Sequence, residues 1–256
     1  FLCSSEAAFI TGSARAAAIE ATAAGLHWTF APTVDVARDQ RWGRVAEAAG
    51  EDVFLSCAFS AARVQGFQGD DLKAADTLLA TPKHFAAYGA VMGGLDYNSV
   101  EISEGTLRDV HLPPFKAALD AGALTIMSAF NDINGVPASA NHQLMTVILR
   151  HEWKFRGFVV SDYTADFELV AHGYASDDSE ATELAFNAGL DMSMQSGLYG
   201  AHLAALVESG KVGLQTVDDS VRRVLAVKDA IGLFDNPYRS LDPQRESELD
   251  LSQHTA

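Results

Sequence analysis

Short apolar segments alternate with helix-like segments along most of this 256-residue chain. The segments expected to form strands are His27–Asp35, Leu78–Phe85, Leu124–Ala129, Phe158–Ser161 and Leu190–Met194. The segments expected to form helices are Glu6–Ala24, Glu51–Gln68, Ser103–Asp120 with an interruption at Pro113–Pro114, Asn141–Glu152, Ala181–Ala188, Ala201–Ser209 and Val217–Ile231. Gly122, Gly157 and Gly189 each follow a helical segment, as helix C-caps do. Strands that alternate with helices in this way indicate βαβ units and a parallel sheet, open or closed.

The pattern changes near the carboxyl end of the chain. Pro237 and Pro243 lie in turn-like stretches, and a charged tail follows them to Ala256. We therefore expect one α/β domain over residues 1–234 and a linker over residues 235–256. Fewer than eight strand segments precede that linker, so a complete eight-stranded barrel needs sequence upstream of Phe1.

Composition limits the classes of ligand and partner. The formal net charge is −16, with 34 acidic and 18 basic residues, and it disfavours binding to nucleic acid while leaving neutral sugars open. No run of about 18 apolar residues is present, so we expect no membrane span. Cys3 and Cys57 have no metal-ligand spacing, and His84 has no partner histidine at a ligand spacing. We expect neither a metal nor a cofactor.

Polar side chains follow several of the expected strands, where a parallel α/β fold places its chemistry. They are Asp35 to Arg44, Lys83 and His84, Ser128 to Asn131, Asp162 with Tyr163 behind it, and Asp191. Asp162 alone has an equally good second interpretation as the N-cap of the next helix. The convergence of the whole set favours one polar pocket at the ends of the strands.

These residue types suit the recognition of hydroxyl groups. Lysine and arginine donate hydrogen bonds, aspartate accepts them, and aromatic faces such as Trp42 and Tyr163 can pack on the C–H face of a sugar ring. The glycine-rich stretches lack the spacing of a phosphate-binding loop, and no GxSxG motif supports a serine hydrolase.

At these positions the chain resembles glycoside hydrolase family 3, the group of β-glucosidases and β-xylosidases. The motifs that carry the resemblance are Ala31–Arg44, Pro82–Gly89, Met127–Asn131 with Asn134–Pro137, Gly157–Asp162, Ala188–Met192 and Arg223–Phe234. They run in order from about Thr22 to Pro243, and the likeness is strongest to the periplasmic bacterial β-glucosidases of the family. The resemblance implies a TIM-type (β/α)8 barrel, incomplete at its amino end, and a periplasmic or secreted bacterial location.

The resemblance also implies roles for individual residues. The nucleophilic aspartate of the family falls on Asp162, and its substrate-binding arginine and Lys-His pair fall on Arg44, Lys83 and His84. Tyr163 stands where the family often has tryptophan. Phe130 stands where the family often has tyrosine, which removes a hydroxyl near the reaction centre. Cationic Lys83 and Arg44 would favour an ionised nucleophile.

Two family features fall outside this chain. A sugar-binding aspartate belongs to a segment before Phe1, and the acid/base of the β-glucosidase type belongs to a second α/β domain after the linker. The single-domain amino-sugar hydrolases of the family use a histidine–aspartate dyad on the loop after the Lys-His strand. The loop Gly89–Asn98 has no histidine, which disfavours that type.

The activity implied is retaining, exo-acting hydrolysis of β-linked oligosaccharides or of aryl and alkyl β-glycosides, through a covalent glycosyl-Asp162 intermediate. β-Glucosidase is the first expectation and β-xylosidase the alternative. Two other classes stay open: a sugar-binding barrel without catalysis, and an aldolase that uses Lys83 as a Schiff-base amine. The acidic surroundings of Lys83 disfavour the aldolase, because they should raise its pKa.

Overall fold

A computed structural model of the chain describes residues 7–248. Its α-helices are α1 (Ala7–Ala23), α2 (Val53–Gln68), α3 (Glu104–Thr106), α4 (Pro113–Asp120), α5 (Asp178–Ala188), α6 (Leu198–Glu208), α7 (Leu214–Ala230) and α8 (Pro243–Glu248). The 3₁₀-helices are η1 (Val45–Glu47), η2 (Tyr88–Ala90), η3 (Met92–Gly94), η5 (Ala138–Ala140) and η7 (Phe167–Leu169). The π-helices are η4 (Leu107–His111) and η6 (Gln143–Glu152). The strands are β1 (Thr125–Met127), β2 (Asp132–Ile133), β3 (Val136–Pro137), β4 (Phe158–Tyr163) and β5 (Met192–Met194).

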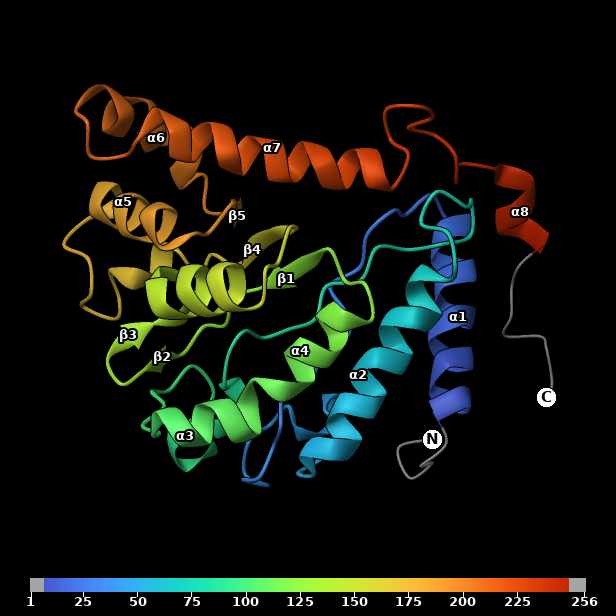
Figure 1. Ribbon diagram of the computed structural model, residues 1–256, viewed down its shortest axis with the longest axis horizontal. Coiled ribbons are helices and arrows are strands. Elements are labelled where there is room, and N and C mark those ends of the chain that lie inside the picture. The colour runs from blue at the N-terminus through green and yellow to red at the C-terminus, as the bar shows by residue number, and fades with distance from the viewer. Residues whose placement is uncertain (1–6, 249–256) are drawn as a thin grey trace.

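The strands at the centre of the molecule are parallel. Strand β4 pairs with β1 on one side and with β5 on the other. Helices α1, α2 and α4 lie on one side of these strands, and α5, α6 and α7 lie on the other (Figure 1). This arrangement confirms the predicted α/β fold with a parallel sheet.

Two further segments extend the parallel array. Single parallel bridges join Trp28 to Leu79, Thr33 to Lys83, and Phe85 to Ser128. The predicted strands around His27–Asp35 and Leu78–Phe85 are therefore present as extended, bridged chain and not as regular strands. Within residues 7–248, no pairing joins β5 back to the Trp28 segment, so the structure shows a parallel array and no closed barrel.

Local chemistry explains where the helices begin and end. The Asp52 side chain accepts a hydrogen bond from the Leu55 amide at the start of α2, and Asp177 does the same for Glu180 at the start of α5. Gly189 ends α5 with φ of 111°, a conformation that other residues rarely adopt. The predicted helix from Ser103 to Asp120 is split into α3, η4 and α4, and α4 begins at Pro113.

Gly157 serves a different purpose from the predicted C-cap. Helix η6 ends five residues earlier, at Glu152, and Gly157 does not have a positive φ. A Cβ atom at Gly157 would lie 1.8 Å from the Leu124 carbonyl oxygen. The glycine is required because two backbone segments approach closely where β1 and β4 start to pair.

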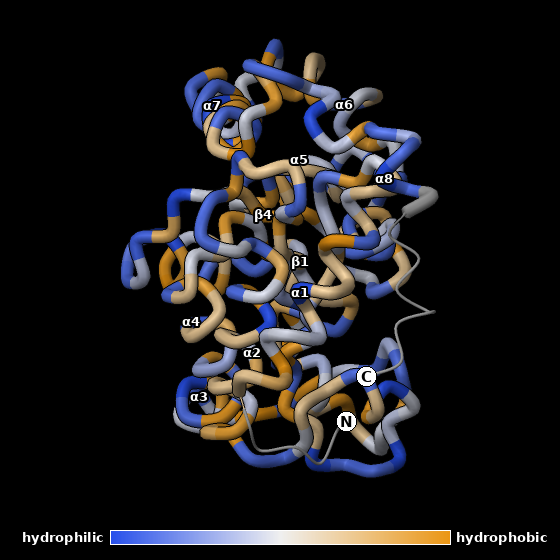
Figure 2. Tube along the Cα trace, turned by 90° about the vertical axis from the view of Figure 1, so that its right-hand side faces the viewer, coloured by the Kyte–Doolittle hydropathy of each residue, from blue (hydrophilic) through white to orange (hydrophobic). Residues whose placement is uncertain are grey.

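The main core fills the space between the parallel array and the helices around it. Among its fully buried side chains are Phe85, Phe115, Ile126, Leu144 and Leu149. Hydrophobic segments run through the inside of the molecule and hydrophilic turns lie at its periphery (Figure 2). Burial of this apolar surface, worth about 25 cal/mol per Å², is the main force that holds the helices against the strands.

A small hairpin, β2–β3, was absent from the sequence expectations. Asn134 and Gly135 form its turn with φ of 52° and 83°, and Ile133 bridges to Val100. Two adjacent residues with positive φ are typical of the two-residue hairpin turn that Asn-Gly favours. The Asn134–Gly135 dipeptide is therefore a sequence signal for this hairpin.

Residues after α7 pack against the amino-terminal half of the chain. The Arg239 side chain donates to the carbonyl oxygens of Ala74 and Thr77, and Ala24 bridges to Leu241. The division of the chain into residues 1–234 and a linker over 235–256 stays a prediction. No helix in the described range 7–248 has the combination of length and apolar character that crossing a membrane requires.

Candidate active site

Asp162 lies at the carboxyl end of strand β4. Its side chain is 14% exposed, and one carboxylate oxygen, Oδ1, accepts a hydrogen bond of 2.7 Å from the Tyr163 amide. The next helical turn, η7, begins only at Phe167, and the Asp162 side chain does not cap it. The N-cap interpretation is therefore wrong, and the second carboxylate oxygen, Oδ2, is directed toward His84.

Asp35, His84 and Asp162 form a row of three polar side chains. The Asp35 Oδ2 atom accepts hydrogen bonds from the backbone N–H of His84 (3.1 Å) and from its ring Nδ1 (2.8 Å). The other ring nitrogen, Nε2, lies 3.5 Å from Asp162 Oδ2. His84 is fully buried and Asp35 is 2% exposed. A buried carboxylate on Nδ1 fixes the orientation of an imidazole, so it directs Nε2 toward Asp162.

Arg44 lies beside this row and is held by a glutamate. Its Nε and terminal nitrogen donate to the two oxygens of Glu47 at 2.7 and 2.9 Å, and its guanidinium lies 5.6 Å from the centre of the Tyr88 ring. The hydrogen bonds from Arg44 are the largest cause of the lowered pKa of Glu47, and the charge of Lys83 lowers it further. Glu47 also accepts a hydrogen bond of 3.2 Å from the Thr33 hydroxyl. Arg44, Glu47 and Lys83 therefore form one charged cluster.

Aromatic rings cover one side of these polar groups. The Tyr88 ring packs edge-on against His84 at 5.1 Å, and Phe130 lies 4.5 Å from Tyr97 and 5.9 Å from Tyr88. Burial raises the pKa of Tyr88 well above its ordinary value. Tyr97 places a phenol beside Phe130, where the family resemblance had suggested that a hydroxyl was lost.

Two aromatic side chains differ in their availability to a sugar. Trp42 is 1% exposed, and its indole N–H donates to Asp96 at 3.0 Å. It belongs to the core, so the expectation that it packs on a sugar ring is wrong. Tyr163 is 56% exposed next to Asp162 and remains available for such contact.

A second carboxyl group, that of Glu168, is affected by the charge of Asp162. Burial, followed by the charge of Asp162, raises the pKa of Glu168 to about 7. The pKa of Tyr97 is also raised, first by burial and then by charges that include Glu168 and Asp162. Asp162, Glu168 and Tyr97 thus share one electrostatic environment.

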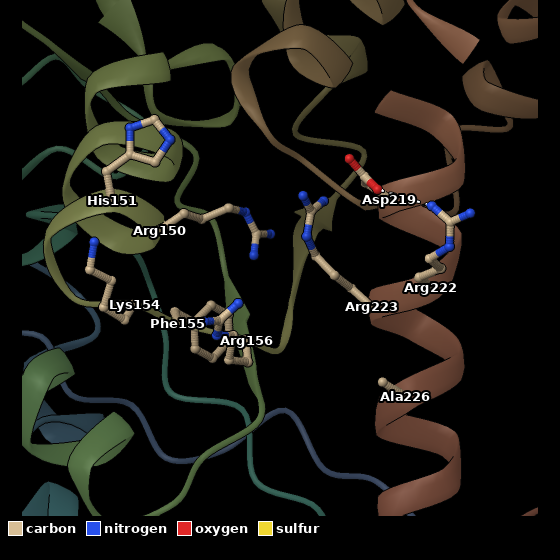
Figure 3. A pocket seen from close by; sticks show the side chains of 9 residues that line it. All are labelled: Arg150, His151, Lys154, Phe155, Arg156, Asp219, Arg222, Arg223 and Ala226. Carbon is tan, nitrogen blue, oxygen red and sulfur yellow. Dashed lines mark hydrogen bonds and ion pairs between the residues drawn. The ribbon is translucent and has the colours of Figure 1, made fainter. Parts of the chain in front are cut away.

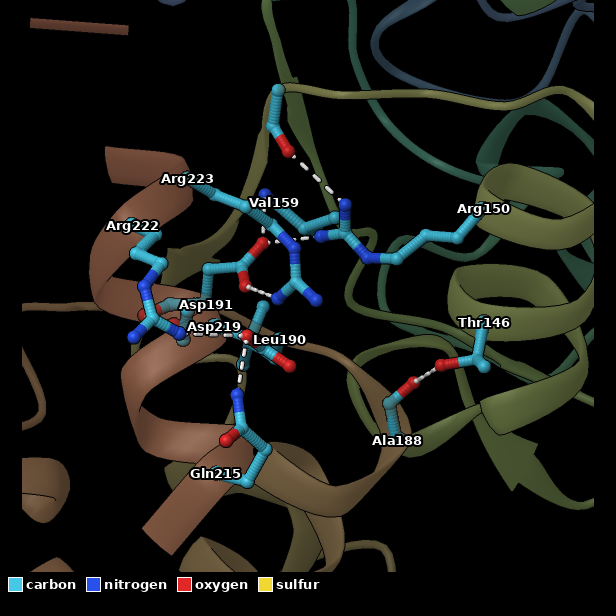
Figure 4. A network of polar contacts seen from close by, with 12 residues as sticks. Thr146, Arg150, Val159, Ala188, Leu190, Asp191, Gln215, Asp219, Arg222 and Arg223 are labelled. Atoms are coloured by element: carbon cyan, nitrogen blue, oxygen red, sulfur yellow. Dashed lines mark hydrogen bonds and ion pairs between the residues drawn. The ribbon is translucent and has the colours of Figure 1, made fainter. Parts of the chain in front are cut away.

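Asp191 lies elsewhere, although the sequence had grouped it with the pocket. Arg150 from η6 and Arg223 from α7 reach toward each other (Figure 3), and their guanidinium groups bind the two oxygens of the Asp191 carboxylate (Figure 4). Asp191 also accepts a hydrogen bond from the Val159 amide, near the start of β4. The pocket prediction for Asp191 is wrong, because the start of β5 places it at the amino end of β4.

The structure therefore brings most of the predicted site residues together. Asp162, His84, Lys83 and Arg44 lie around the ends of β4 and of the Thr33–Lys83 bridge, with Phe130 behind them and Tyr163 beside Asp162.

The sequence places Asp35 in the pocket but does not pair it with His84, and it gives no role to Glu47, Tyr97 or Glu168. Glu47 had a usable signal, since it follows Arg44 at a spacing that favours pairing within a helical turn. Tyr97 and Glu168 had none.

Most of the chain matches one family of known proteins. The model of the glycosyl hydrolase family 3 N-terminal domain matches residues 3–227. The chain belongs to glycoside hydrolase family 3. A family 3 relative, the periplasmic β-glucosidase of Salmonella typhimurium, is 44% identical over 238 residues, which are 93% of this chain and 31% of that protein. A putative β-xylosidase of Formosa agariphila is 39% identical over 227 residues, 87% of this chain and 30% of that protein.

Solved structures of β-glucosidases are similar to this chain in both fold and sequence. β-Glucosidase from Listeria innocua in complex with glucose has a TM-score of 0.93 and 41% identity, and the match covers 95% of this chain and 34% of that one. A mutant of the same enzyme in complex with laminaribiose has a TM-score of 0.96 and 40% identity over 98% of this chain and 35% of that one. The chain thus spans about a third of the length of these relatives.

Proposed function

We propose that the protein carrying this chain is a retaining, exo-acting β-glycosidase of the β-glucosidase type. The observation that carries the proposal is the placement of Asp162. A carboxylate at the end of a parallel strand lies 3.5 Å from His84 Nε2, a ring that Asp35 holds in place, beside the charged cluster of Arg44 and Lys83. Such a carboxylate is anchored but partly open to solvent, as a nucleophile must be.

The proposed reaction has two steps. In the first, an oxygen of Asp162 forms a bond to the anomeric carbon, and the bond from that carbon to the leaving oxygen breaks while a carboxylic acid protonates that oxygen. In the second, the resulting carboxylate removes a proton from water, and the water oxygen displaces Asp162 from the sugar. The sugar leaves with its original anomeric configuration.

The proposed sugar contacts come from the remaining site residues. Arg44 and Lys83 donate hydrogen bonds to hydroxyls of the terminal sugar, and His84 Nε2, a buried atom without a hydrogen-bond partner among the described residues, adds another. Phe130 and Tyr163 supply apolar surface for the ring. The acid/base comes from a second α/β domain, as the family resemblance implies.

The architecture proposed with this mechanism is a TIM-type (β/α)8 barrel whose first part lies upstream of Phe1. Residues 1–234 belong to that barrel, and residues 235–256 lead to the second domain. The parallel order of the segments at Trp28, Leu79, β1, β4 and β5 supports the barrel. The periplasmic relative supports a periplasmic or secreted location.

The proposed substrates are β-linked glucosides, either oligosaccharides or aryl and alkyl glycosides. The related enzyme bound to glucose or laminaribiose supports this class. β-Xylosidase is the second candidate, because a putative β-xylosidase is also a close match. The ratio of kcat/KM for nitrophenyl β-glucoside and β-xyloside discriminates the two, since a xyloside lacks the hydroxymethyl group that a glucosidase pocket contacts.

The mechanism is tested by the anomeric configuration of the first product and by the kcat of one variant. Proton NMR of the first product should show the β-anomer before mutarotation, and Asp162→Asn should lower kcat by about 10⁴-fold or more. Asp120→Asn, an exposed change that breaks only a surface ion pair with Lys116, is the control and should be neutral. Normal turnover by Asp162→Asn, or the α-anomer as first product, would contradict the mechanism. Sugar binding without any hydrolysis would favour a binding barrel.

A further inference from the structure

The basic residues of this acidic chain are unevenly distributed. The net charge is −16, yet five of the 18 lysines and arginines line one cavity of about 650 Å³ between η6 and α7. They are Arg150, Lys154, Arg156, Arg222 and Arg223 (Figure 3), and His151 lies with them. Asp219 is the one acidic residue of the lining. Positive charges held close together repel one another, and a bound anion offsets that free-energy cost.

Part of this charge is already balanced within the fold. Arg150 and Arg223 share the buried Asp191 carboxylate, and Arg222 pairs with Asp219 (Figure 4). Arg222 also pairs with Asp218. Two guanidinium groups on one carboxylate leave an excess of one positive charge at the inner wall. Arg150 is 10% exposed, and its Nε atom has no hydrogen-bond partner within residues 7–248. A buried donor without a partner favours an incoming acceptor.

The outer wall carries charge that nothing nearby balances. Lys154 and Arg156 are exposed, and neither forms an ion pair with any residue in the range 7–248. Lysine supplies a point charge and arginine a planar fork of donors, and phosphate groups in proteins are commonly bound by both types together. The volume of the cavity suits a small molecule better than a single water-sized ion.

The cavity is separate from the candidate active site. Arg150 donates to the Gly157 carbonyl oxygen at 3.0 Å, just before β4 begins, whereas Asp162 lies near the end of β4. Five residues of extended chain span roughly 15 Å. A ligand here would not contact a sugar bound at Asp162.

We propose that this cavity binds a phosphate dianion, either as the free ion or as the phosphate group of a small metabolite. Arg150 and Arg223 form the floor of the site, and Lys154 and Arg156 contact the anion from the solvent side. Asp219 opposes binding, since its carboxylate faces the same space (Figure 3). The proposal does not depend on the glycosidase activity.

Calorimetric titration of the protein at constant ionic strength tests the proposal, with inorganic phosphate, glucose 6-phosphate and glucose as ligands. Lys154→Gln/Arg156→Gln should weaken phosphate binding by roughly tenfold or more, because each change removes a charge-assisted contact. The control Lys73→Gln/Lys211→Gln removes the same charge from exposed residues outside the cavity and should change binding less than twofold. Asp219→Asn should strengthen binding.

The affinities for inorganic phosphate and glucose 6-phosphate also show which kind of ligand the cavity binds. Tighter binding of glucose 6-phosphate than of phosphate assigns the site to a phosphorylated metabolite, and equal binding assigns it to the free ion. Absence of binding by both, or equal weakening by the two double variants, would overturn the proposal. Thermal unfolding of each variant without ligand shows that a loss of binding does not come from a loss of fold.

Discussion

At the scale of single residues, the least expected role is that of Asp35. Its Oδ2 atom accepts from both the backbone and the ring of His84, so one buried carboxylate oxygen sets the direction of the imidazole. Sequence alone placed Asp35 at a strand end but gave no reason to pair it with His84, 49 positions away. That pairing depends on the Thr33–Lys83 bridge, which brings the two segments side by side.

Asp35→Asn tests this positioning role. The amide oxygen of asparagine carries no negative charge, so it accepts from the two His84 donors more weakly than Asp35 Oδ2 does, and Nε2 is held less firmly in its direction. We expect kcat for an aryl β-glucoside to fall about 100-fold with a smaller change in KM. Asp39→Asn, on the same loop but paired with exposed Arg41, is the matched control and should leave kcat within about twofold. Equal kcat for both variants would remove the role assigned to Asp35.

Glu168 predicts a dependence of stability on pH. Its pKa in the folded protein is raised to about 7, mainly by burial, so folding favours the protonated form. The stabilising contribution is present below the ordinary pKa of about 4.5 and is lost as the pH rises through 7. With allowance for solvent screening of a half-buried group, the loss between pH 5 and pH 8 is about 1 kcal/mol.

Glu168→Gln should abolish that loss, because glutamine does not ionise. The measurement is the free energy of unfolding by urea at pH 5 and at pH 8, compared with Glu208→Gln, an exposed change at the end of α6. The Glu168→Gln variant should gain stability relative to the parent at pH 8 and not at pH 5. A gain of equal size at both pH values would contradict the burial of an ionisable carboxyl there.

At the scale of elements, the sequence predicted helices more accurately than strands. Helices α1, α2, α5 and α7 lie within a few residues of their expected ranges, because their capping residues and helical length are local signals. The segments at Trp28 and Leu79 make only single bridges, since strand regularity depends on neighbours that are distant in sequence. The hairpin β2–β3 is too short for a periodic signal, and only its Asn-Gly turn marks it.

The pairing of β1 with β4 gives the clearest test at this scale. Gly157→Ala would drive a methyl group into the Leu124 carbonyl oxygen, where backbone and not a flexible side chain must yield. We expect a loss of about 3 kcal/mol or more in the free energy of unfolding, measured with urea. Gly200→Ala is the matched control, since no atom lies within 4 Å of the added Cβ and the site is inside α6. The control should be neutral or slightly stabilising, and equal losses would contradict the close approach.

At the scale of the whole molecule, chemistry concentrates at both ends of the central strands. The carboxyl end of β4 carries Asp162 and its aromatic and cationic surroundings, and the amino end carries the cavity between η6 and α7. The sequence predicted the first cluster, because residues at the ends of parallel strands converge and the family motifs mark them. It missed the second, because η6 and α7 are about 70 positions apart and no motif links the basic residues of one to those of the other.

Covalent trapping tests the central claim most directly. The protein carrying this chain is incubated with a 2-deoxy-2-fluoro-β-glucoside that has a good leaving group, digested, and analysed by peptide mass spectrometry. We expect a fluoroglucosyl adduct on the peptide that contains Asp162, because the fluorine slows release of the covalent intermediate. An adduct on another carboxylate, or no adduct in protein that hydrolyses an aryl β-glucoside, would contradict the assignment of Asp162 as the nucleophile.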